Sequence, residues 1–235
     1  MGFADKEHID FVEGEILSFD KPLHWTSFDL VAKVRHTVCR AIGQKKLKVG
    51  HSGTLDPLAT GVVVVCTGRK TKLIDQLQYD DKEYVATLQL GATTPSFDME
   101  HPVDQTYPTA HITRALIDEV IPQFVGEQWQ VPPMYSAVWV DGKRAYQIAR
   151  KGGTVELKPK LLVIDEIEVL AFDPETMLLT IRVVCSKGTY IRALARDIGE
   201  RLGSGAYLTA LRRTRVGDIR IEDCMTIDDF LEMMN

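Results

Sequence analysis

The spacing of apolar residues predicts a chain of short, alternating strands and helices. Apolar side chains recur at intervals of three and four residues from Val31 to Ile42, which predicts a helix capped by Ser27 and ended by Gly43. The β-branched run at 61–67 is typical of a strand buried on both faces. The other predicted elements are strands at 15–20, 82–90 and 134–140, helices at 70–78, 112–124, 144–150 and 190–202, and a hairpin of 161–170 with 177–186.

The order of these elements indicates the fold class. Strands and helices interleave without a regular βαβ repeat, and no low-complexity linker divides the chain. We therefore predict an α+β fold with a mixed, largely antiparallel central sheet flanked by helices and loops. We expect an acidic extension at 1–14, followed by one domain at 15–235 that ends in a short acidic helix.

The formal net charge of −5 argues against a nucleic-acid partner, but the distribution of charge along the chain does not. Residues 1–20 and 221–235 together carry a formal charge of −10, so residues 21–220 carry about +5. A cationic middle portion of this kind can hold a polyanion, although charge alone favours a solvated surface. The basic clusters in this portion are Arg40 with Lys45, Lys46 and Lys48; Lys143 with Arg144, Arg150 and Lys151; and Arg201 with Arg212, Arg213 and Arg215.

Several classes of protein are excluded by missing patterns. No stretch approaches the roughly 20 apolar residues of a membrane span, and the acidic start lacks the regions of a signal peptide, so we expect a cytoplasmic protein. The four cysteines form no C-x-x-C pair and the six histidines show no ligand spacing. We therefore expect no metal site and no cofactor.

The block GHSGTLDPLATG at 50–61 surrounds one carboxylate with conformationally special residues. It matches neither a phosphate-binding P-loop nor the nucleophile elbow G-x-S-x-G. Asp56 followed by Pro57 is typical of the start of a helix or turn, where the carboxylate caps free N–H groups. The glycines upstream also allow backbone to approach a ligand closely. Both interpretations stay open on spacing alone.

The longer segment GHSGTLDPLATGVVVVCTGRKTK at 50–72 resembles the signature of the TruB-type tRNA pseudouridine synthases. The similarity extends from about residue 15 to residue 230, and it implies the pseudouridine synthase catalytic fold. Further matching blocks follow in the family's order: DKP at 20–22, KEYVATLQLG at 82–91, VPPMYSAVWVDGKRAYQIAR at 131–150, SKGTYIRALARDIGE at 186–200 and ALRRTRVG at 210–217.

The resemblance implies isomerisation of a T-loop uridine, position 55 of tRNA, to pseudouridine, without a cofactor. Asp56 would be the nucleophile, acting on a nucleotide flipped out of the RNA. Arg192 has no acidic neighbour on its own helix, and the family places this arginine against the catalytic aspartate. Tyr190 would contact the target base and take part in proton transfer. Without the resemblance, Arg192 could equally face water and Tyr190 could simply pack against the core.

The resemblance also implies roles in substrate binding. Tyr84 would stack on the flipped uracil, although its place on the apolar face of a strand is also typical of a core residue. His51 would displace and hold the target nucleotide, or else stabilise a turn. Leu211 would form an apolar wall, with Arg212 and Arg213 nearby for phosphate. Lys21 and Pro22 would shape the floor of the site.

Two departures from the family pattern affect these expectations. The segment ATTPSFDMEHP at 92–102 keeps Asp98 but lacks the family's first acid and its glycine. The chain ends at Asn235 without the extra C-terminal RNA-binding domain of longer members, so we expect weaker, salt-sensitive binding of tRNA. The expected partner is the T-loop and acceptor arm of tRNA, bound by a monomer without an obligate protein partner. A tRNA-folding factor without catalysis and a synthase for another RNA remain as alternatives.

Overall fold

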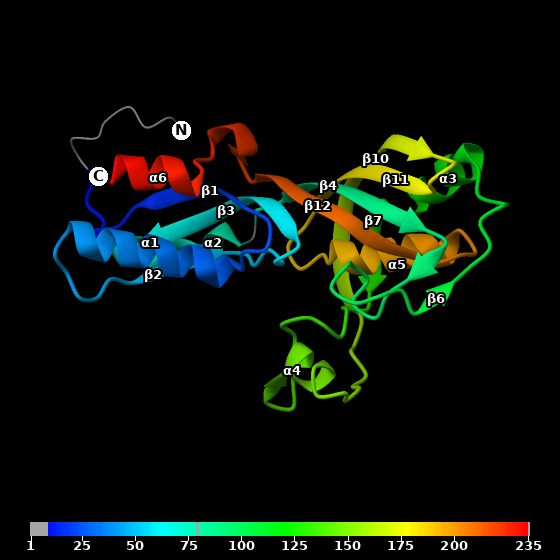
Figure 1. Cartoon of the computed structure of the whole chain (residues 1–235), viewed down its shortest axis with the longest axis horizontal. Coiled ribbons are helices and arrows are strands. Elements are labelled where there is room, and N and C mark those ends of the chain that lie inside the picture. Colours follow the sequence, from blue (N-terminus) through cyan, green and yellow to red (C-terminus); the bar gives the residue numbers. More distant parts are fainter. Residues whose placement is uncertain (1–8, 79, 235) are drawn as a thin grey trace. The chain divides into compact units, whose positions relative to one another are not determined.

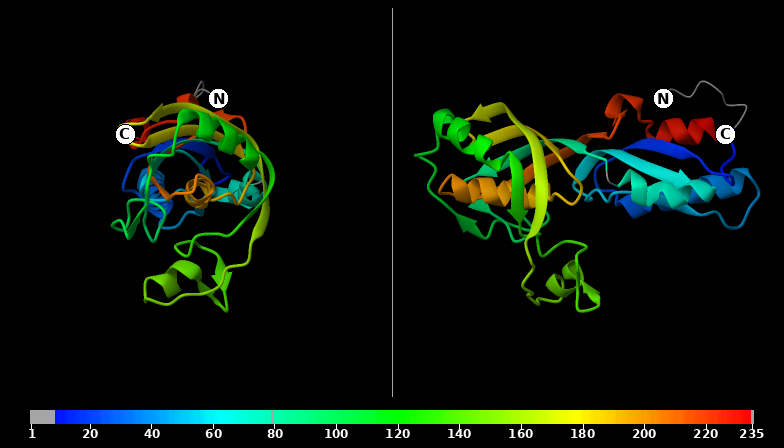
Figure 2. Two further views of the ribbon diagram at one scale, coloured as in Figure 1. Left: turned by 90° about the vertical axis from the view of Figure 1, so that its right-hand side faces the viewer. Right: turned by 180° about the vertical axis from the view of Figure 1, so that it is seen from behind.

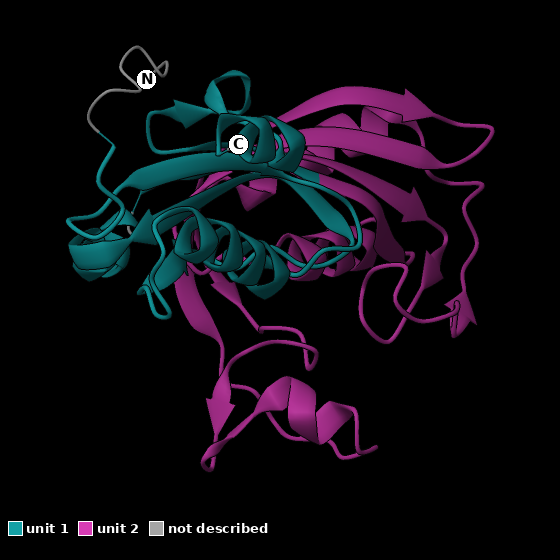
Figure 3. Ribbon diagram, turned by 60° about the vertical axis from the view of Figure 1, so that its left-hand side comes forward, with its two compact units in different colours: residues 1–84, 212–235 teal, residues 85–211 magenta. Residues whose placement is uncertain are grey.

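The computed structural model describes residues 9–78 and 80–234 (Figure 1). The chain divides into two compact units (Figure 3): unit 1 comprises residues 1–84 and 212–235, and unit 2 comprises residues 85–211. The strands β4 (Lys82–Leu90) and β12 (Ala206–Val216) each contribute residues to both units. Strands and helices alternate irregularly in both, which confirms the predicted α+β class.

Unit 1 is built around a buried strand. β1 (Ile16–Lys21) and β2 (Val49–Ser52) both pair antiparallel with β3 (Ala59–Thr67). Every residue of β3 except Thr60 is buried, as predicted for a strand covered on both faces. Its remaining elements are α1 (Ser27–Ala41), the 3₁₀-helix η2 (Gly68–Leu73), α2 (Ile74–Leu77), β13 (Ile219–Arg220), the 3₁₀-helix η4 (Ile221–Asp223) and α6 (Ile227–Met233).

The start of α1 differs from the prediction by one residue, with a consequence for the loop at Asp56. Thr26 is the N-cap, because its hydroxyl accepts from the Asp29 N–H while the Asp29 carboxylate accepts from the Thr26 N–H. The predicted cap, Ser27, is instead the first helical residue. Its buried hydroxyl accepts from the Leu55 N–H at 2.9 Å and donates to the Leu55 carbonyl at 3.2 Å. The helix therefore anchors the residue that precedes Asp56.

Unit 2 contains a second antiparallel arrangement. β10 (Lys160–Asp173) pairs with β11 (Leu178–Cys185) on one side and with β7 (Gly126–Gln130) on the other, which confirms the predicted hairpin. The strand order across this unit is β12-β4-β11-β10-β7. Its other elements are β5 (Ala92–Thr93), β6 (Gln105–Thr106), α3 (Arg114–Val120), the 3₁₀-helix η3 (Ile121–Phe124), β8 (Trp139–Val140), β9 (Lys143–Arg144), α4 (Ala145–Ala149) and α5 (Ile191–Arg201).

The helix α5 and the strand β4 follow their predicted patterns. Ile191, Leu194 and Ile198 are buried on one side of α5, as their spacing predicts. In β4, buried and half-buried residues alternate along all nine positions, and Tyr84 lies on the buried face. Of the predicted site residues, Tyr84 lies on β4, Arg192 lies on α5 and Tyr190 is the N-cap of α5.

Three shorter predictions were confirmed only in part. The predicted strand at 134–140 shrinks to the two residues of β8, since the Ser136 and Val138 carbonyls accept from the start of α4 instead of from a strand. This segment with α4 projects from the rest of unit 2 (Figure 2). The predicted helix at 70–78 is a 3₁₀-helix followed by one α-turn, with Leu73 exposed. The predicted helix at 112–124 changes to a 3₁₀-helix at Ile121, where Pro122 lacks an N–H group.

Candidate active site

Asp56 lies in a tight turn of unit 1 between β2 and β3. The Ala59 N–H donates to the Asp56 carbonyl at 3.0 Å, which closes the turn. The Pro57 carbonyl accepts from the His24 N–H at 2.8 Å, and Leu55 is held by Ser27. The backbone is therefore fixed on both sides of the carboxylate. The Asp56-Pro57 pair marks a turn, one of the two predicted outcomes, and not a helix start.

Arg213 braces this turn from inside the unit. Its side chain is 1% exposed, and its Nε donates to the Val62 carbonyl at 2.7 Å while Nη2 donates to the Gly53 carbonyl at 3.2 Å. The backbone of Arg213 also passes so close to Gly61 that a Cβ there would lie 2.1 Å from the Arg213 carbonyl oxygen. The loop thus requires glycine at position 61.

The predicted phosphate contact of Arg213 is corrected by its burial, whereas that of Arg212 stays a prediction, because the Arg212 side chain is 41% exposed. Arg213 is buried against loop carbonyls, and Arg212 donates from Nη2 to the Asp20 carboxylate at 2.7 Å and from Nη1 to the Thr60 hydroxyl at 3.1 Å. The physical reason is the alternation of β12, which directs Arg213 into the interior of unit 1. Arg213 therefore stabilises the loop that presents Asp56, and Arg212 links β1 to β3.

Lys21 supplies a buried cation in the same unit. Its side chain is completely buried at the end of β1, and its Nζ donates to the carbonyls of Pro22 at 2.9 Å and Trp25 at 2.6 Å. Burial lowers the pKa of Lys21 to about 8; the Asp56 carboxylate opposes this decrease and Arg213 adds to it. The sequence indicated only a role in shaping the floor of the site, whereas Lys21 also interacts electrostatically with Asp56.

The shifted pKa of Lys21 predicts a gain in stability at alkaline pH. Between about pH 8 and its ordinary value of 10.5, the unfolded chain holds a proton that the folded chain has lost. The free energy of unfolding of the wild type should therefore rise, relative to that of Lys21→Met, by up to about 1.4 kcal/mol per pH unit. Urea unfolding of both proteins at pH 8 and pH 9.5 measures this. If the difference in free energy of unfolding between the two proteins stays constant over this range, the pKa of Lys21 is not lowered by folding.

His51 and Ser52 precede the turn on β2. Burial lowers the pKa of the His51 imidazole, and a hydrogen bond to Gly53 only partly offsets this, so the ring is neutral at neutral pH. Its Nδ1 atom and the Ser52 hydroxyl are buried without a hydrogen-bond partner. Buried polar atoms are rarely unpaired in folded proteins. The predicted site residue His51 therefore has an unused ring nitrogen beside the Asp56 turn.

In unit 2, Arg192 is buried at the first turn of α5. Its side chain forms an ion pair with Asp98, with 3.7 Å between Nε and Oδ2, and it donates to the carbonyls of Ser96 at 3.2 Å and Tyr135 at 2.9 Å. Both charged side chains are at most 10% exposed. The sequence shows no acidic neighbour of Arg192 on its own helix, and its partner Asp98 accordingly comes from another segment of the chain. Asp98 belongs to the segment in which this chain departs from the family pattern, and it nevertheless binds Arg192.

Tyr190 is the N-cap of α5, and Gln130 holds its backbone on both sides. The Tyr190 N–H donates to Gln130 Oε1 at 2.9 Å, and Gln130 Nε2 donates to the Tyr190 carbonyl at 3.2 Å. Gln130 is 4% exposed at the end of β7. Gln130 was not selected from the sequence, because no strand was predicted at 126–130 and its burial is visible only in the structure.

Three more unpaired polar atoms surround the Arg192 contacts in unit 2. The Ser96 and Ser136 hydroxyls and His101 Nδ1 are buried without a hydrogen-bond partner. The His101 ring lies 4.5 Å from the ring of Tyr135, whose carbonyl accepts from Arg192. None of these three residues was singled out from the sequence. Their clustering marks this part of unit 2 as a second candidate region for polar contact with a ligand.

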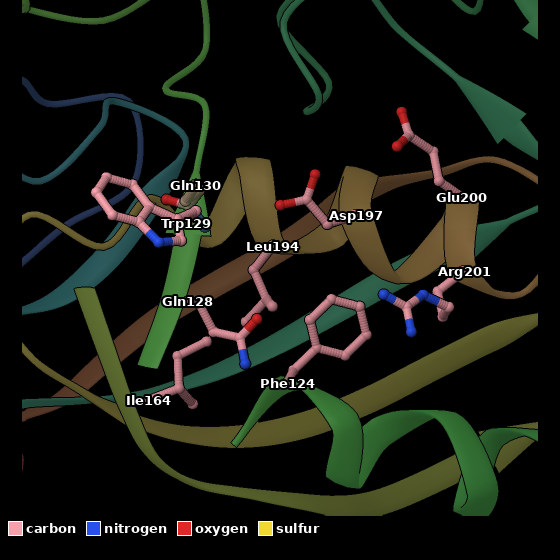
Figure 4. Close-up of a pocket in the computed structure, with 9 residues that line it drawn as sticks. All are labelled: Phe124, Gln128, Trp129, Gln130, Ile164, Leu194, Asp197, Glu200 and Arg201. Atoms are coloured by element: carbon pink, nitrogen blue, oxygen red, sulfur yellow. The ribbon is translucent and has the colours of Figure 1, made fainter. Parts of the chain in front are cut away.

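Gln130 also lines a cavity of about 380 Å³ (Figure 4). Trp129 and Gln130 of β7 line it together with Leu194 and Asp197 of α5. Burial raises the pKa of Asp197, although the adjacent Arg196 guanidinium opposes the increase. None of the predicted site residues lines this cavity.

Two further predicted residues, Tyr84 and Leu211, lie where the units join along the chain. Tyr84 is 8% exposed, and Leu211 is half-buried on β12. Asp56, His51, Lys21 and Tyr84 belong to unit 1, whereas Tyr190, Arg192 and Leu211 belong to unit 2. The predicted approach of Arg192 to Asp56 therefore involves both units and stays a prediction.

Within residues 9–78 and 80–234, no group of three or more His, Cys, Asp or Glu side chains could hold a metal ion. In the same part of the chain, no helix combines the length and apolar character needed to cross a bilayer.

Comparison with known proteins identifies the family. Residues 40–191 match the model of the TruB family pseudouridylate synthase N-terminal domain, and residues 192–235 match that of the tRNA pseudouridylate synthase B C-terminal domain. A tRNA pseudouridine synthase B from Phocaeicola vulgatus is 63% identical over 97% of this chain and 96% of its own length. The protein of that name from Flavobacterium johnsoniae is 47% identical over 96% of this chain and 98% of its length.

Solved structures support the same relationship. The chain resembles a subunit in the crystal structure of a Cbf5-Nop10-Gar1 complex, with a TM-score of 0.68 and 29% identity over 94% of this chain. It also resembles a chain in the structure of an H/ACA RNP bound to a substrate RNA containing 2′-deoxyuridine, with a TM-score of 0.67 and 26% identity. This chain spans 54% of the length of each of those two chains. Together with the family models and the curated relatives, these similarities establish that the chain belongs to the TruB family of pseudouridylate synthases, isomerases that act on tRNA.

Proposed function

We propose that this protein isomerises the uridine at position 55 in the T-loop of tRNA, with Asp56 as the nucleophile. The observation that supports this most is the braced turn of unit 1, in which Ser27 and Arg213 fix the backbone around one carboxylate. The relatives that are named tRNA pseudouridine synthase B match almost the whole chain.

The reaction conserves atoms, because the uracil leaves and rejoins the same ribose. The bond between C1′ and N1 breaks, the base turns within the site, and C1′ bonds to C5, whose proton is then lost as N1 gains one. Asp56 assists by attacking the ribose, by adding to the base or by removing a sugar proton. In each case the carboxylate must be ionised and close to a nucleotide flipped out of the RNA.

A buried cation interacts with Asp56. Lys21 is a buried ammonium that interacts with the carboxylate within unit 1. A nearby cation stabilises a carboxylate against the cost of burial. We assign Arg192 to the same task at the moment of reaction, when the substrate has displaced water, with Asp98 holding its guanidinium in place.

The other predicted residues take roles in recognition. Tyr84 stacks on the flipped base and Leu211 forms an apolar wall beside it. Tyr190, positioned through its backbone by Gln130, contacts the base and relays a proton. His51, neutral and with an unused nitrogen, holds the displaced nucleotide. The substrate is the T-loop and acceptor arm of tRNA, bound by a monomer in the cytoplasm without a cofactor or a protein partner.

The experiment is pseudouridine formation by the purified protein in an unmodified tRNA transcript. Site-specific conversion at position 55, equal with and without EDTA, is the expected result, and a transcript with cytidine at that position serves as the control. Binding of the transcript without conversion would favour a tRNA-folding factor, because such a factor needs the same contacts but no ionised aspartate. Conversion of a different RNA and not of tRNA would favour a synthase with another substrate.

A further inference from the structure

The segment between Asp29 and Asp75 has an unusual charge. It contains nine lysine and arginine residues and one acid, Asp56, in a chain whose formal net charge is −5. Two of these cations, Arg69 and Lys70, pair with Glu13 and Glu15. The remaining cations lie on α1, on the loop after it and on η2.

Four of these cations line one groove of unit 1, of about 550 Å³. We call it the basic groove and define it by Arg35, Lys45, Lys46 and Lys48. No acidic side chain is among the described residues that line it. The three lysines are exposed, and none of them forms an ion pair within residues 9–78 and 80–234. Like charges gathered in this way repel one another, and binding of a polyanion removes that repulsion.

The floor of the basic groove is rigid. Arg35 Nη2 donates to the Val49 carbonyl at 3.3 Å, which ties α1 to β2. Ile74 closes the groove against Gly50, where a Cβ would lie 2.7 Å from the Ile74 side chain. Of the three lysines, Lys48 is held through its backbone, because its carbonyl accepts from the Gly68 N–H at 2.9 Å.

The basic groove leads directly into the candidate active site of the same unit. Val49 and Gly50 line it, and the next two residues of β2 are His51 and Ser52, which precede the Asp56 turn. A polyanion bound here would run along the strand that presents the site. RNA is a long polyanion that could occupy both the basic groove and the candidate active site. An acidic peptide would have no reason to continue toward a site that acts on a nucleotide.

We propose that the basic groove binds backbone phosphates of the substrate RNA outside the flipped nucleotide. This inference rests on the proposed function and adds to it a second region of contact, one that senses charge and not base identity. Phosphate contacts of this kind release counterions. Each contact therefore steepens the slope of the logarithm of the binding constant against the logarithm of the salt concentration by about 0.7 to 0.9. The lysines therefore raise affinity most at low salt.

The test is a triple variant, Lys45→Gln, Lys46→Gln and Lys48→Gln, assayed for binding of unmodified tRNA transcript over a series of NaCl concentrations. We expect the Kd at low salt to rise about tenfold or more and the salt slope to fall by about 2. The control is Lys158→Gln with Lys160→Gln, two exposed lysines of unit 2, for which we expect the wild-type Kd. Replacement of the three groove lysines by arginine should retain affinity, because charge is retained.

A wild-type Kd and salt slope in the groove variant, or an equal loss in the control variant, would overturn the proposal. A thermal unfolding scan of both variants checks that each is folded. The two proposals fail in different measurements. The groove proposal fails if the Kd and salt slope of the groove variant equal those of the wild type, and the proposed function fails if the wild type forms no pseudouridine.

Discussion

Replacing Asp56 with asparagine should abolish pseudouridine formation while leaving the fold and RNA binding intact. The amide has nearly the shape of the carboxylate but neither its charge nor its nucleophilicity. The turn should persist, because it is held by backbone bonds at Asp56 and Pro57 and by Ser27 and Arg213, none of which uses the Asp56 side chain. Removal of a nucleophile reduces turnover by about 10⁴-fold or more.

Single-turnover conversion of an unmodified transcript, with enzyme in excess, measures this loss without interference from product release. The matched control is Asp75→Asn, an exposed acid of α2 in the same unit, which should convert at the wild-type rate. The transcript Kd of Asp56→Asn should stay within a few-fold of wild type. A conversion rate within tenfold of wild type would mean that Asp56 presents the loop but does not react.

Elements with long, uninterrupted patterns could be predicted from the sequence, and short ones could not. The stripe of α5 and the alternation of β4 each extend over about ten residues, so local spacing identifies the buried face. The start of α1 was wrong by one residue because both Thr26 and Ser27 can cap, and only Thr26 lies three residues before Asp29. The strand at 134–140 failed because α4 takes the backbone bonds that a strand would use.

The site shows the same division between local and distant information. Asp56 could be selected because its block is contiguous in the sequence. The role of Arg213 in holding the Asp56 turn could not be predicted, since Arg213 lies about 150 residues away from its partner Val62. The burial of Arg213 follows from the alternation of β12, which is visible only in the structure. The same holds for Gln130, whose partner Tyr190 is 60 residues distant. Burial also gave Lys21 an electrostatic role that composition alone does not reveal.

The second large effect is expected at the Arg192–Asp98 pair of unit 2. Arg192→Met should lower the free energy of unfolding by about 3 to 5 kcal/mol, because it leaves the Asp98 carboxylate buried without its cation. Adding Asp98→Asn removes that uncompensated charge. The double variant should therefore be more stable than Arg192→Met by about 1 to 3 kcal/mol. Urea unfolding of the wild type, both single variants and the double variant measures the coupling.

The two readouts of this cycle separate a structural role from a catalytic one. If Arg192 only holds the segment at 96–98 against α5, restoring stability in the double variant should also restore pseudouridine formation. If Arg192 assists Asp56, as we propose, activity should remain absent in the double variant although stability returns, because methionine supplies no charge in place of the guanidinium. Asp98→Asn alone should retain partial activity, since Arg192 still donates to the carbonyls of Ser96 and Tyr135. Full activity in the double variant would therefore remove Arg192 from the mechanism and leave Lys21 as the cation that interacts with Asp56 within unit 1.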